Sequence, residues 1–276
     1  RVATDPATFA PNAKIVHIDI DRAEIDKNVL THHHIIGDAR RVLELLNEKL
    51  PQHDYPEWKA WVFSHPEVPL KKDDVLHPHE ILETIQAVTG GDAIVATDVG
   101  QHQMWCAQYY HFSRPGQFIT SGGFGTMGFG LGAAMGAAVG NPGKVVVHCT
   151  GDGCFRMNMN EIATATRYNI PVVEVIVNNH VLGMVRQWQT LFYGKRYSQT
   201  ILNDSVDFVK IAEAMGARAY RVTQKEELEP VLREAISLNI PVVIDCQISC
   251  DDKVFPMVSP GAPIADAFDD TDLKIN

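Results

Sequence analysis

The chain has 276 residues, of which 45% are hydrophobic, and its 34 acidic and 24 basic residues give a formal net charge of -10. This length and composition allow a sizeable core in one large α/β domain or two smaller ones. The acidic balance argues against a protein that binds the phosphate backbone of nucleic acids, because such proteins usually present a basic face. No apolar run approaches the roughly 20 residues that a membrane-spanning helix needs. We therefore expect small-molecule chemistry, with no nucleic-acid and no membrane partner.

Five cysteines, an odd number, occur without a CxxC pair or a regular spacing. This pattern favours a reducing, cytoplasmic compartment over a disulfide framework. Cys149 and Cys246 lie within apolar runs and are expected in the core. Surface or satisfied core positions are predicted for the histidines that match no catalytic spacing, which are His17, His53, His65, His77, His79, His111 and His148.

The first 74 residues combine two short strand patterns, a helix and an irregular segment. Residues 14–21 alternate apolar and polar side chains as a strand does, and residues 35–36 form a second short strand. Gly37 and Asp38 then open a helix that runs to residue 50. Residues 51–74 are rich in Pro, Trp and charge without a clean period, so we predict a linker between two domains.

From residue 78 onward, helices and strands alternate. Strands are predicted at residues 93–97, 144–149, 171–177, 218–222 and 241–248. Helices are predicted at residues 78–89, 126–139, 160–168, 182–193, 205–215 and 225–238. Nearly continuous Val and Ile runs separated by helices indicate an α/β fold, a mostly parallel sheet with helices on both faces. Ligands of such sheets bind beyond the carboxyl ends of the strands.

Polar residues follow two of these strands. The strand at 144–149 leads to Gly151, Asp152 and Gly153, and the next strand ends in Asn178 and Asn179. Glycines beside an Asp let the backbone approach a phosphate, while the carboxylate and an amide oxygen suit Mg²⁺. The alternative for Gly-Asp-Gly by itself is a tight turn. The pair of motifs indicates a diphosphate ligand held with Mg²⁺.

The spacing of Asp152 and Asn179 resembles the thiamine-diphosphate motif that begins with GDG and ends with NN. Three further segments, at residues 99–105, 122–130 and 182–193, resemble acetolactate synthase (acetohydroxyacid synthase). Together the matches cover residues 97–200 almost continuously. The chain is therefore expected to resemble the C-terminal part of the large, catalytic subunit of that family.

The resemblance implies a metal and cofactor site. Asp152, Asn179 and the carbonyl of Val181 would ligate Mg²⁺. The diphosphate would contact Gly100, Gln101, His102, Gly153 and Cys154, where Cys154 replaces a commoner Ser or Ala and would use its backbone N–H. Thiamine diphosphate as a whole would be bound by Val99, Gly100, Gln101, His102, Gly125, Met127, Gly151, Asp152, Gly153, Cys154, Asn179, Val181, Gly183 and Met184.

Three of the implied residues, Met127, Met184 and Trp188, would act on the reacting groups. Gly125 and Met127 resemble the residues that hold the aminopyrimidine ring, with the Met127 thioether as a wedge that keeps the cofactor bent. The alternative for Met127 is filler at the start of a Gly-rich helix. Met184 and Trp188 lie four residues apart on one helical face. The matching tryptophan of the family faces the second-substrate pocket and favours 2-oxobutyrate over pyruvate.

A core stripe is the alternative for Met184 and Trp188, and the polar neighbours Gln187 and Gln189 weaken it.

The N-terminal residues resemble the end of the family's central domain, where FAD binds. Asp19 and Ile20 lie at a strand tip, where an acidic residue typically receives a ribose hydroxyl. Gly37, Asp38 and Ala39 match a later FAD contact. The implied organisation is the end of a FAD-type domain at 1–50, a linker at 51–76, a thiamine-diphosphate domain at 77–250 and a C-terminal arm at 251–276.

The implied reaction condenses pyruvate with a second 2-oxo acid to 2-acetolactate or 2-aceto-2-hydroxybutyrate and releases CO₂. Its substrates are small 2-oxo acids, and the implied partners are further copies in a homodimer or larger homo-oligomer and a small regulatory subunit. The family's catalytic glutamate comes from a domain that this sequence does not resemble, so the chain alone is expected to be nearly inactive. The alternatives are a pyruvate oxidase or glyoxylate carboligase type of enzyme, or a non-catalytic cofactor-binding subunit.

Overall fold

The computed structural model describes residues 5–64, 70–202 and 205–273. The chain divides into two compact units, one made of Arg1–Pro69 and Phe255–Asn276 and the other of Leu70–Val254.

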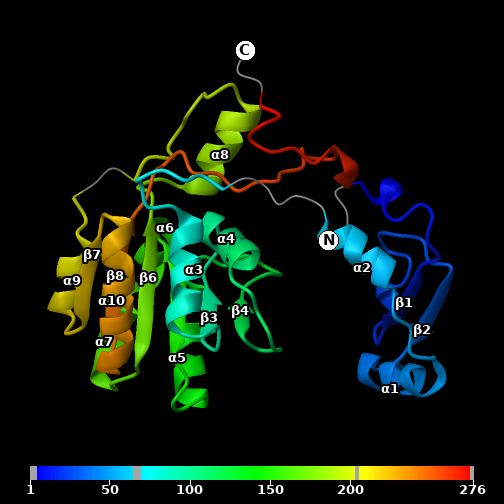
Figure 1. Cartoon of the computed structure of the whole chain (residues 1–276), viewed down its shortest axis with the longest axis horizontal. Coiled ribbons are helices and arrows are strands. Elements are labelled where there is room, and N and C mark those ends of the chain that lie inside the picture. The colour runs from blue at the N-terminus through cyan, green and yellow to red at the C-terminus, as the bar shows by residue number, and fades with distance from the viewer. Residues whose placement is uncertain (1–4, 65–69, 203–204, 274–276) are drawn as a thin grey trace. The chain divides into compact units, whose positions relative to one another are not determined.

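The larger unit is built on a parallel sheet (Figure 1). Among the described residues of this unit, six strands lie in the order β4-β3-β5-β6-β8-β7, and every neighbouring pair is parallel. The strands are β3 (Ile94–Thr97), β4 (Phe118–Thr120), β5 (Val146–Gly151), β6 (Val172–Asn178), β7 (Arg218–Val222) and β8 (Val242–Gln247). The predicted parallel α/β sheet is confirmed.

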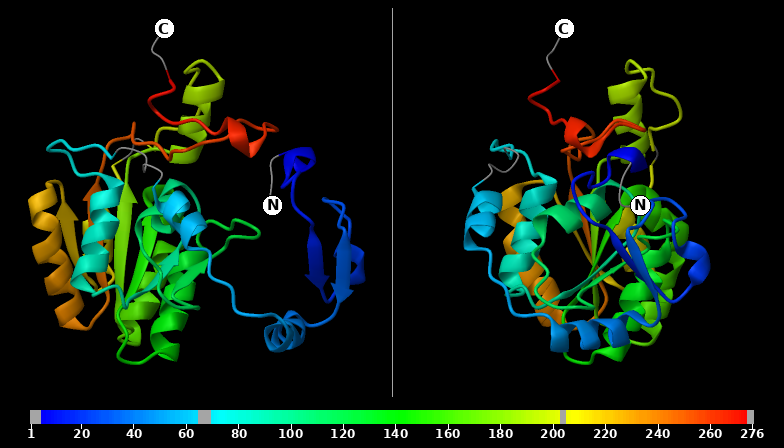
Figure 2. Two further views of the ribbon diagram at one scale, coloured as in Figure 1. Left: turned by 45° about the vertical axis from the view of Figure 1, so that its right-hand side comes forward. Right: turned by 90° about the vertical axis from the view of Figure 1, so that its right-hand side faces the viewer.

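Helices cover both faces of this sheet (Figure 2, right). One face packs against α3 (Pro78–Val88), α4 (Gln101–Tyr109) and α10 (Lys225–Leu238). The other face packs against α5 (Phe129–Gly140), α6 (Asp152–Asn158), α7 (Ile162–Arg167) and α9 (Phe208–Ala214). Helix α8 (Gly183–Phe192) follows β6 and lies beyond the strand ends (Figure 1).

Alternation along the strands explains the two cores. Val173, Val175 and Val177 of β6 belong to the cluster that contains Trp105 of α4. Ile176, between them, belongs to the cluster on the opposite face. Successive side chains of a strand point to opposite faces, so a strand covered on both sides is apolar throughout. This is why β5, β6 and β8 read as continuous apolar runs.

Three elements of the larger unit were not predicted, namely α4, β4 and α6. Helix α4 lacks a clear apolar period because Gln101 and His102 are buried with Trp105. Helix α5 begins at Phe129 rather than at the predicted residue 126. Gly128 precedes it with φ of 87°, a left-handed conformation that suits glycine.

In its described residues, the smaller unit contains two parallel strands, β1 (Val16–Asp19) and β2 (His33–Ile36), and two α-helices, α1 (Ala39–Lys49) and α2 (Pro56–Phe63). The prediction of an irregular segment at 51–74 was wrong for α2, whose sequence is apolar without an amphipathic period. Within 255–273 the structure has a single 3₁₀ turn at Ile264–Asp266 and a bridge between Met257 and Phe268. His65 lies outside the described residues.

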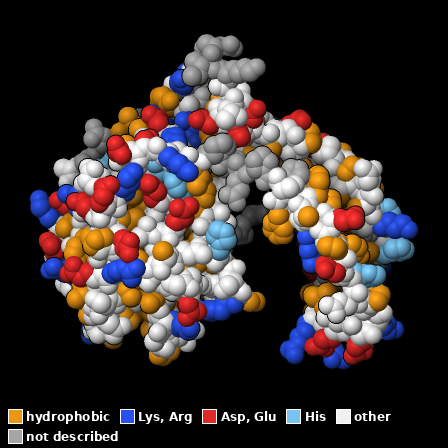
Figure 3. All heavy atoms as spheres, in the orientation of Figure 1, with side chains coloured by type: hydrophobic (Ala, Val, Ile, Leu, Met, Phe, Trp, Pro, Cys, Tyr) orange, Lys and Arg blue, Asp and Glu red, His pale blue; other side chains and the backbone are white. Residues whose placement is uncertain are grey.

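The surface carries mixed charge. On the face in Figure 3, acidic and basic side chains of the described residues lie interspersed. All five cysteines are free thiols, and Cys149 and Cys246 are fully buried, as predicted. Within the described ranges, none of the helices has the length and apolar character that a membrane span requires.

Candidate functional site

The strand order creates a switch point between β3 and β5. From β3 the chain passes to β4 on one side and then to β5 on the other. Connections leave the sheet in opposite directions at such a point, which opens a crevice at the carboxyl ends of the strands. A cavity lies there, lined by Val99, Gly100, Gln101, His102, Trp105, Met127, Gly151, Asp152, Gly153, Cys154, Val177, Asn179, Val181, Leu182, Gly183, Met184 and Val185.

This cavity brings together the predicted cofactor residues of four loops, those that follow β3, β4, β5 and β6. Gly125 is the predicted residue that does not line it. A Cβ atom at Gly125 would lie 3.8 Å from Val99 Cγ1, so the residue adjoins the cavity wall instead. Trp105, Val177, Leu182 and Val185 line the cavity and were not predicted.

Asp152 is a buried carboxylate in this cavity. It follows β5 directly, begins α6 and is 2% exposed. Its Oδ2 atom has no hydrogen-bond partner among the described residues. Burial raises the pKa of Asp152 to about 6, because neighbouring positive charges compensate only part of the lost hydration. A buried carboxylate oxygen of this kind is ready to ligate a cation.

Asn179 lies at the tip of the adjacent strand, β6. Its Nδ2 atom donates to Gln101 Oε1 at 3.0 Å, and its Oδ1 atom accepts from the N–H of Val181 at 3.2 Å. The approach of Gln101 depends on Gly183, since a Cβ atom there would lie 1.9 Å from Gln101 Oε1. The predicted metal ligands Asp152, Asn179 and Val181 thus share one cavity with Gln101 and Gly183.

His102 and Cys154 add two buried polar groups. Burial lowers the pKa of His102 to about 4, so its ring is neutral, and its Nε2 atom has no partner in the described part of the chain. The Cys154 thiol donates to the carbonyl of Val99 at 3.0 Å. Burial raises the pKa of that thiol to about 12, so it stays protonated. The half-buried Met127 lies near Gly153, where a Cβ atom would be 3.8 Å from its Cε atom.

These residues fit a divalent cation and an anionic ligand. The donors are oxygens and neutral nitrogens, which suit Mg²⁺ better than a softer metal. Asp152 Oδ2 and His102 Nε2 are buried polar atoms that a ligand would satisfy. In the described residues, three or more His, Cys, Asp or Glu side chains do not cluster as a metal site. Any cation held here would therefore complete its shell with the amide, a backbone carbonyl and the ligand itself.

A second, more open pocket adjoins the first. It is lined by residues of α8 and the segment after it, namely Met184, Val185, Trp188, Gln189, Tyr193 and Arg196. Met184 lines both pockets. Met184 and Trp188 are only half-buried, whereas Gln187 between them is 2% exposed. The alternative of a core stripe is thus wrong for Trp188, and the most buried residue of α8 is polar.

Two buried acidic residues near the cavity, Asp98 and Glu174, were missed, whereas His148 occupies a satisfied core position, as predicted. His148 on β5 lies between Glu174 on β6 and Asp98, the residue after β3. Asp98 in turn accepts from the N–H of Gly130 at 2.9 Å and from the Thr150 hydroxyl at 2.7 Å. Asp98 directly precedes Val99, so this buried group joins the loops that line the cavity. The sequence signal was a His and a Glu inside otherwise apolar strands.

The predicted FAD residues meet in the smaller unit. Asp19 ends β1, and its carbonyl accepts from the N–H of Gly37 at 2.9 Å. Asp38 caps α1 by accepting from the N–H of Arg41 at 3.2 Å, and Ala39 is the first helical residue. Ile20 is 73% exposed. The carboxyl edge of the β1–β2 pair thus brings these predicted residues together.

Comparison with known families identifies the larger unit. Residues 98–246 match the family described as "Thiamine pyrophosphate enzyme, C-terminal TPP binding domain", which is more than half of the chain. The chain belongs to the thiamine pyrophosphate enzymes. Residues 1–46 match the central domain of the same enzymes. The thiamine pyrophosphate match begins at Asp98 and ends in β8, so it includes all four loops of the cavity.

Curated relatives narrow the resemblance within the thiamine pyrophosphate enzymes. The chain is 42% identical over 268 residues to the acetolactate synthase large subunit of Haemophilus influenzae, covering 93% of this chain and 47% of that protein. It is 44% identical to the corresponding subunit of Corynebacterium glutamicum, an alignment that covers 96% of this chain and 45% of that protein. It is 40% identical to the acetolactate synthase isozyme 2 large subunit of Escherichia coli, over 95% of this chain and 48% of that protein. The chain spans about half the length of these relatives.

Proposed function

We propose that this chain is the thiamine-diphosphate-binding part of an acetolactate synthase catalytic subunit. The reaction condenses pyruvate with a second 2-oxo acid to 2-acetolactate or 2-aceto-2-hydroxybutyrate, with release of CO₂, in branched-chain amino-acid biosynthesis. Support comes from identities of 40–44% to large subunits of that enzyme over nearly the whole chain. The observation that carries the proposal is the cavity in which Asp152, Asn179 and Gln101 converge.

Mg²⁺ is held by Asp152, Asn179 and the carbonyl of Val181. The support is the buried, unpaired Oδ2 atom of Asp152, for which a cation supplies the missing charge partner. The diphosphate lies against the loop of Gly100 and Gln101, with His102, Gly153 and Cys154 around it. Cys154 contributes its backbone N–H to the ligand, because its thiol already donates to Val99.

Bound thiamine diphosphate supplies an electron sink for decarboxylation of a 2-oxo acid. Met127, with Gly125 beside it, would pack against the rings of the cofactor and favour its bent form. The open pocket of Met184 and Trp188 receives the second 2-oxo acid, and its indole wall favours the longer 2-oxobutyrate. This assignment is supported by the shared position of Met184 in both pockets.

In the complete enzyme, FAD binds through Asp19, Ile20, Gly37, Asp38 and Ala39 of the smaller unit. The support is the match of residues 1–46 to the central domain and the meeting of these residues at one strand edge. The domain organisation proposed is 1–50, 51–76, 77–250 and 251–276, as predicted above.

The wider setting follows from the same similarity. The proposed partners are further copies of the chain and a small regulatory subunit, as the name "large subunit" of the relatives suggests. A reducing, cytoplasmic setting is supported by the five free thiols.

Calorimetric titration of thiamine diphosphate into the chain, with Mg²⁺ and with a chelator, tests the site directly. We expect binding that requires Mg²⁺ and is lost in Asp152→Ala. Asp74→Ala, which removes an exposed carboxylate outside the cavity, serves as the matched control and should bind as the wild type does. Binding that ignores both Mg²⁺ and Asp152 would contradict the assigned metal site, and a wild-type chain that binds nothing would contradict the proposal as a whole.

A further inference from the structure

A buried relay of side-chain amides connects the cavity to the backbone after β8. Asn179 Nδ2 donates to Gln101 Oε1 at 3.0 Å, and Gln101 Nε2 donates to Gln187 Oε1 at 2.8 Å. Gln187 then pairs with both backbone groups of Val254, since its Oε1 atom accepts from the N–H and its Nε2 atom donates to the carbonyl, each at 2.9 Å. All three amide side chains are at most 5% exposed.

The backbone of Val254 determines which way each amide points. A backbone N–H can only donate and a carbonyl can only accept, so Gln187 Oε1 must face the Val254 N–H. Gln101 must then present its nitrogen to Gln187 Oε1, which leaves Gln101 Oε1 to accept from Asn179. Asn179 is thereby required to point its nitrogen at Gln101. Amide orientations are settled by such networks, and here an obligatory donor and acceptor begin the chain.

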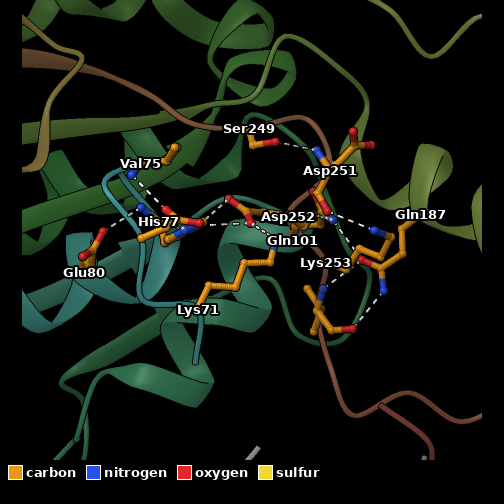
Figure 4. Close-up of polar contacts among 12 residues, drawn as sticks. Lys71, Val75, His77, Glu80, Gln101, Gln187, Ser249, Asp251, Asp252 and Lys253 are labelled. Atoms are coloured by element: carbon orange, nitrogen blue, oxygen red, sulfur yellow. Dashed lines mark hydrogen bonds and ion pairs between the residues drawn. The ribbon is translucent and has the colours of Figure 1, made fainter. Parts of the chain in front are cut away.

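A second anchor holds the middle of the relay. Gln101 Nε2 also donates to the carbonyl of Asp252 at 3.0 Å. Figure 4 shows the Asp252 side chain pointing to the opposite side, toward His77 and Lys71. Its Oδ2 atom lies 3.1 Å from His77 Nδ1 and its Oδ1 atom accepts from Lys71 Nζ at 2.8 Å. The Asp252 carbonyl that accepts from Gln101 is therefore held in place by the side-chain contacts of its own residue with Lys71 and His77.

The far end of the relay is the proposed cation ligand. With its nitrogen committed to Gln101, Asn179 has only Oδ1 left to face a cation. The N–H of Val181 also points at Oδ1, at 3.2 Å, which agrees with this orientation. An amide turned the other way would present N–H groups to the cation and be repelled.

We propose that Gln187 is a positioning residue that, acting through Gln101, orients the Asn179 amide so that Oδ1 is available to the divalent cation. This inference rests on the cation site proposed above and adds Gln187 to it. It also explains why a glutamine is buried on α8 between Met184 and Trp188. An apolar side chain at that position would fill the same volume and leave the Gln101 nitrogen with the Asp252 carbonyl as its one remaining acceptor among the described residues.

Gln187→Met tests the relay with little change in side-chain length or helix propensity. The readout is the Mg²⁺ concentration that half-saturates thiamine-diphosphate binding, measured by calorimetry. We expect it to rise about 10-fold, the scale of one lost hydrogen bond. Gln187→Glu keeps an acceptor for Gln101 and should stay within about 3-fold of the wild type. An unchanged Mg²⁺ requirement in a folded Gln187→Met would overturn the proposal.

Gln86→Met is the matched control. Gln86 also holds a backbone group, since its Oε1 atom accepts from the N–H of His111 at 2.9 Å, but it lies on α3 outside the cavity. We expect this variant to lose stability and to keep the wild-type Mg²⁺ requirement. If the Mg²⁺ requirement of this variant rose as much as that of Gln187→Met, the cause would be a general loss of stability, and the proposal would fail.

Asn179→Asp distinguishes an effect on the orientation of the Asn179 amide from an effect on the packing around Gln187. A carboxylate presents oxygen on both sides, so its orientation no longer matters to the cation. In that background, Gln187→Met should leave the Mg²⁺ requirement within about 2-fold, a non-additive result that marks coupled residues. Equal increases in both backgrounds would refute an effect through Asn179. If the wild type itself shows no Mg²⁺-dependent binding, the cation site fails and not merely the relay.

A direct measurement on the wild-type chain does not depend on whether a variant folds. Crystals grown with thiamine diphosphate and Mn²⁺ locate the cation by its anomalous scattering. We expect Asn179 Oδ1 in its coordination shell and Gln101 between Asn179 and Gln187. A cation bound without Asn179, or an Asn179 side chain detached from Gln101, would overturn the inference.

Discussion

His148 and Glu174 are register partners on the adjacent strands β5 and β6, and His148 Nδ1 lies 2.7 Å from a carboxylate oxygen of Glu174. On the other side of the ring, Nε2 lies 3.2 Å from Asp98 Oδ2. All three side chains are at most 1% exposed. Burial alone would lower the pKa of His148, but the two carboxylates outweigh it and raise the pKa to about 10. A buried imidazolium between two carboxylates therefore stands behind the cofactor cavity.

Glu174→Gln should destabilise the larger unit by about 1–3 kcal/mol at pH 7, because the buried imidazolium loses one of its two charged hydrogen-bond partners. Urea unfolding measures the change in the free energy of unfolding. Glu229→Gln is the control, since it removes the same charge from an exposed pair with Arg233 and should cost at most about 0.5 kcal/mol. Equal effects of the two substitutions would contradict a structural role for the buried pair.

The same group predicts how stability depends on pH. The pKa of His148 in the folded chain lies above its ordinary value of 6.5. The stabilisation that the charged ring gives to the fold is therefore fully present below pH 6.5 and is lost as pH rises through about 10. The free energy of unfolding should therefore fall between pH 6.5 and 10. We expect His148→Gln to be less stable at pH 7 and to show a flatter profile over this window. A wild-type profile that is flat there, or parallel to that of the variant, would be inconsistent with a charged His148.

Asp152→Asn should stabilise the metal-free chain while it weakens cofactor binding. Burial holds the pKa of Asp152 at about 6, above its ordinary 3.8, so the ionised carboxylate destabilises the fold above pH 6 and not below pH 3.8. Removing that charge should raise the free energy of unfolding by about 1–3 kcal/mol at pH 8. Thermal unfolding in chelator measures the gain, and calorimetry with Mg²⁺ measures the loss of affinity. A less stable metal-free variant would show that Asp152 is already compensated.

Gly183→Ala should damage the site by sterics alone. The new Cβ atom would lie 1.9 Å from Gln101 Oε1 and 2.8 Å from Asn179 Nδ2, so both amides must move. We expect thiamine-diphosphate affinity to fall by about 10-fold or more, in line with the loss of a hydrogen bond or two. The control is Gly132→Ala on α5, where a Cβ atom meets nothing within 4 Å.

The control substitution should raise stability by about 0.5–1 kcal/mol, because alanine is the better residue in an exposed helix interior. It should leave the affinity for thiamine diphosphate unchanged. Equal affinities of the two alanine variants would show that the close approach at Gly183 does not matter to the site.

Local sequence was sufficient for five of the six described strands of the sheet, all but β4, and for much of the cavity. The apolar runs of β5, β6 and β8 predict buried parallel strands, and parallel strands bring their carboxyl ends to one edge. For that reason Asp152 and Asn179 could be expected together before any coordinates were known. The helix α4 could not be predicted in this way, because it buries Gln101 and His102 on the side facing the cavity as well as Trp105 in the core.

What the sequence determined was the parallel α/β fold and the residues at its strand tips, because strand and helix periods are local. Only the tertiary structure decided the state of the polar residues behind those tips. Gln187 reads as a solvated residue until α8 folds against Gln101 and Val254, which are 86 and 67 positions away. His148 becomes charged because β6 places Glu174, 26 residues later, at 2.7 Å, and the end of β3 places Asp98 at 3.2 Å. Burial and hydrogen-bond partners are properties of distant segments meeting, and no local pattern encodes them.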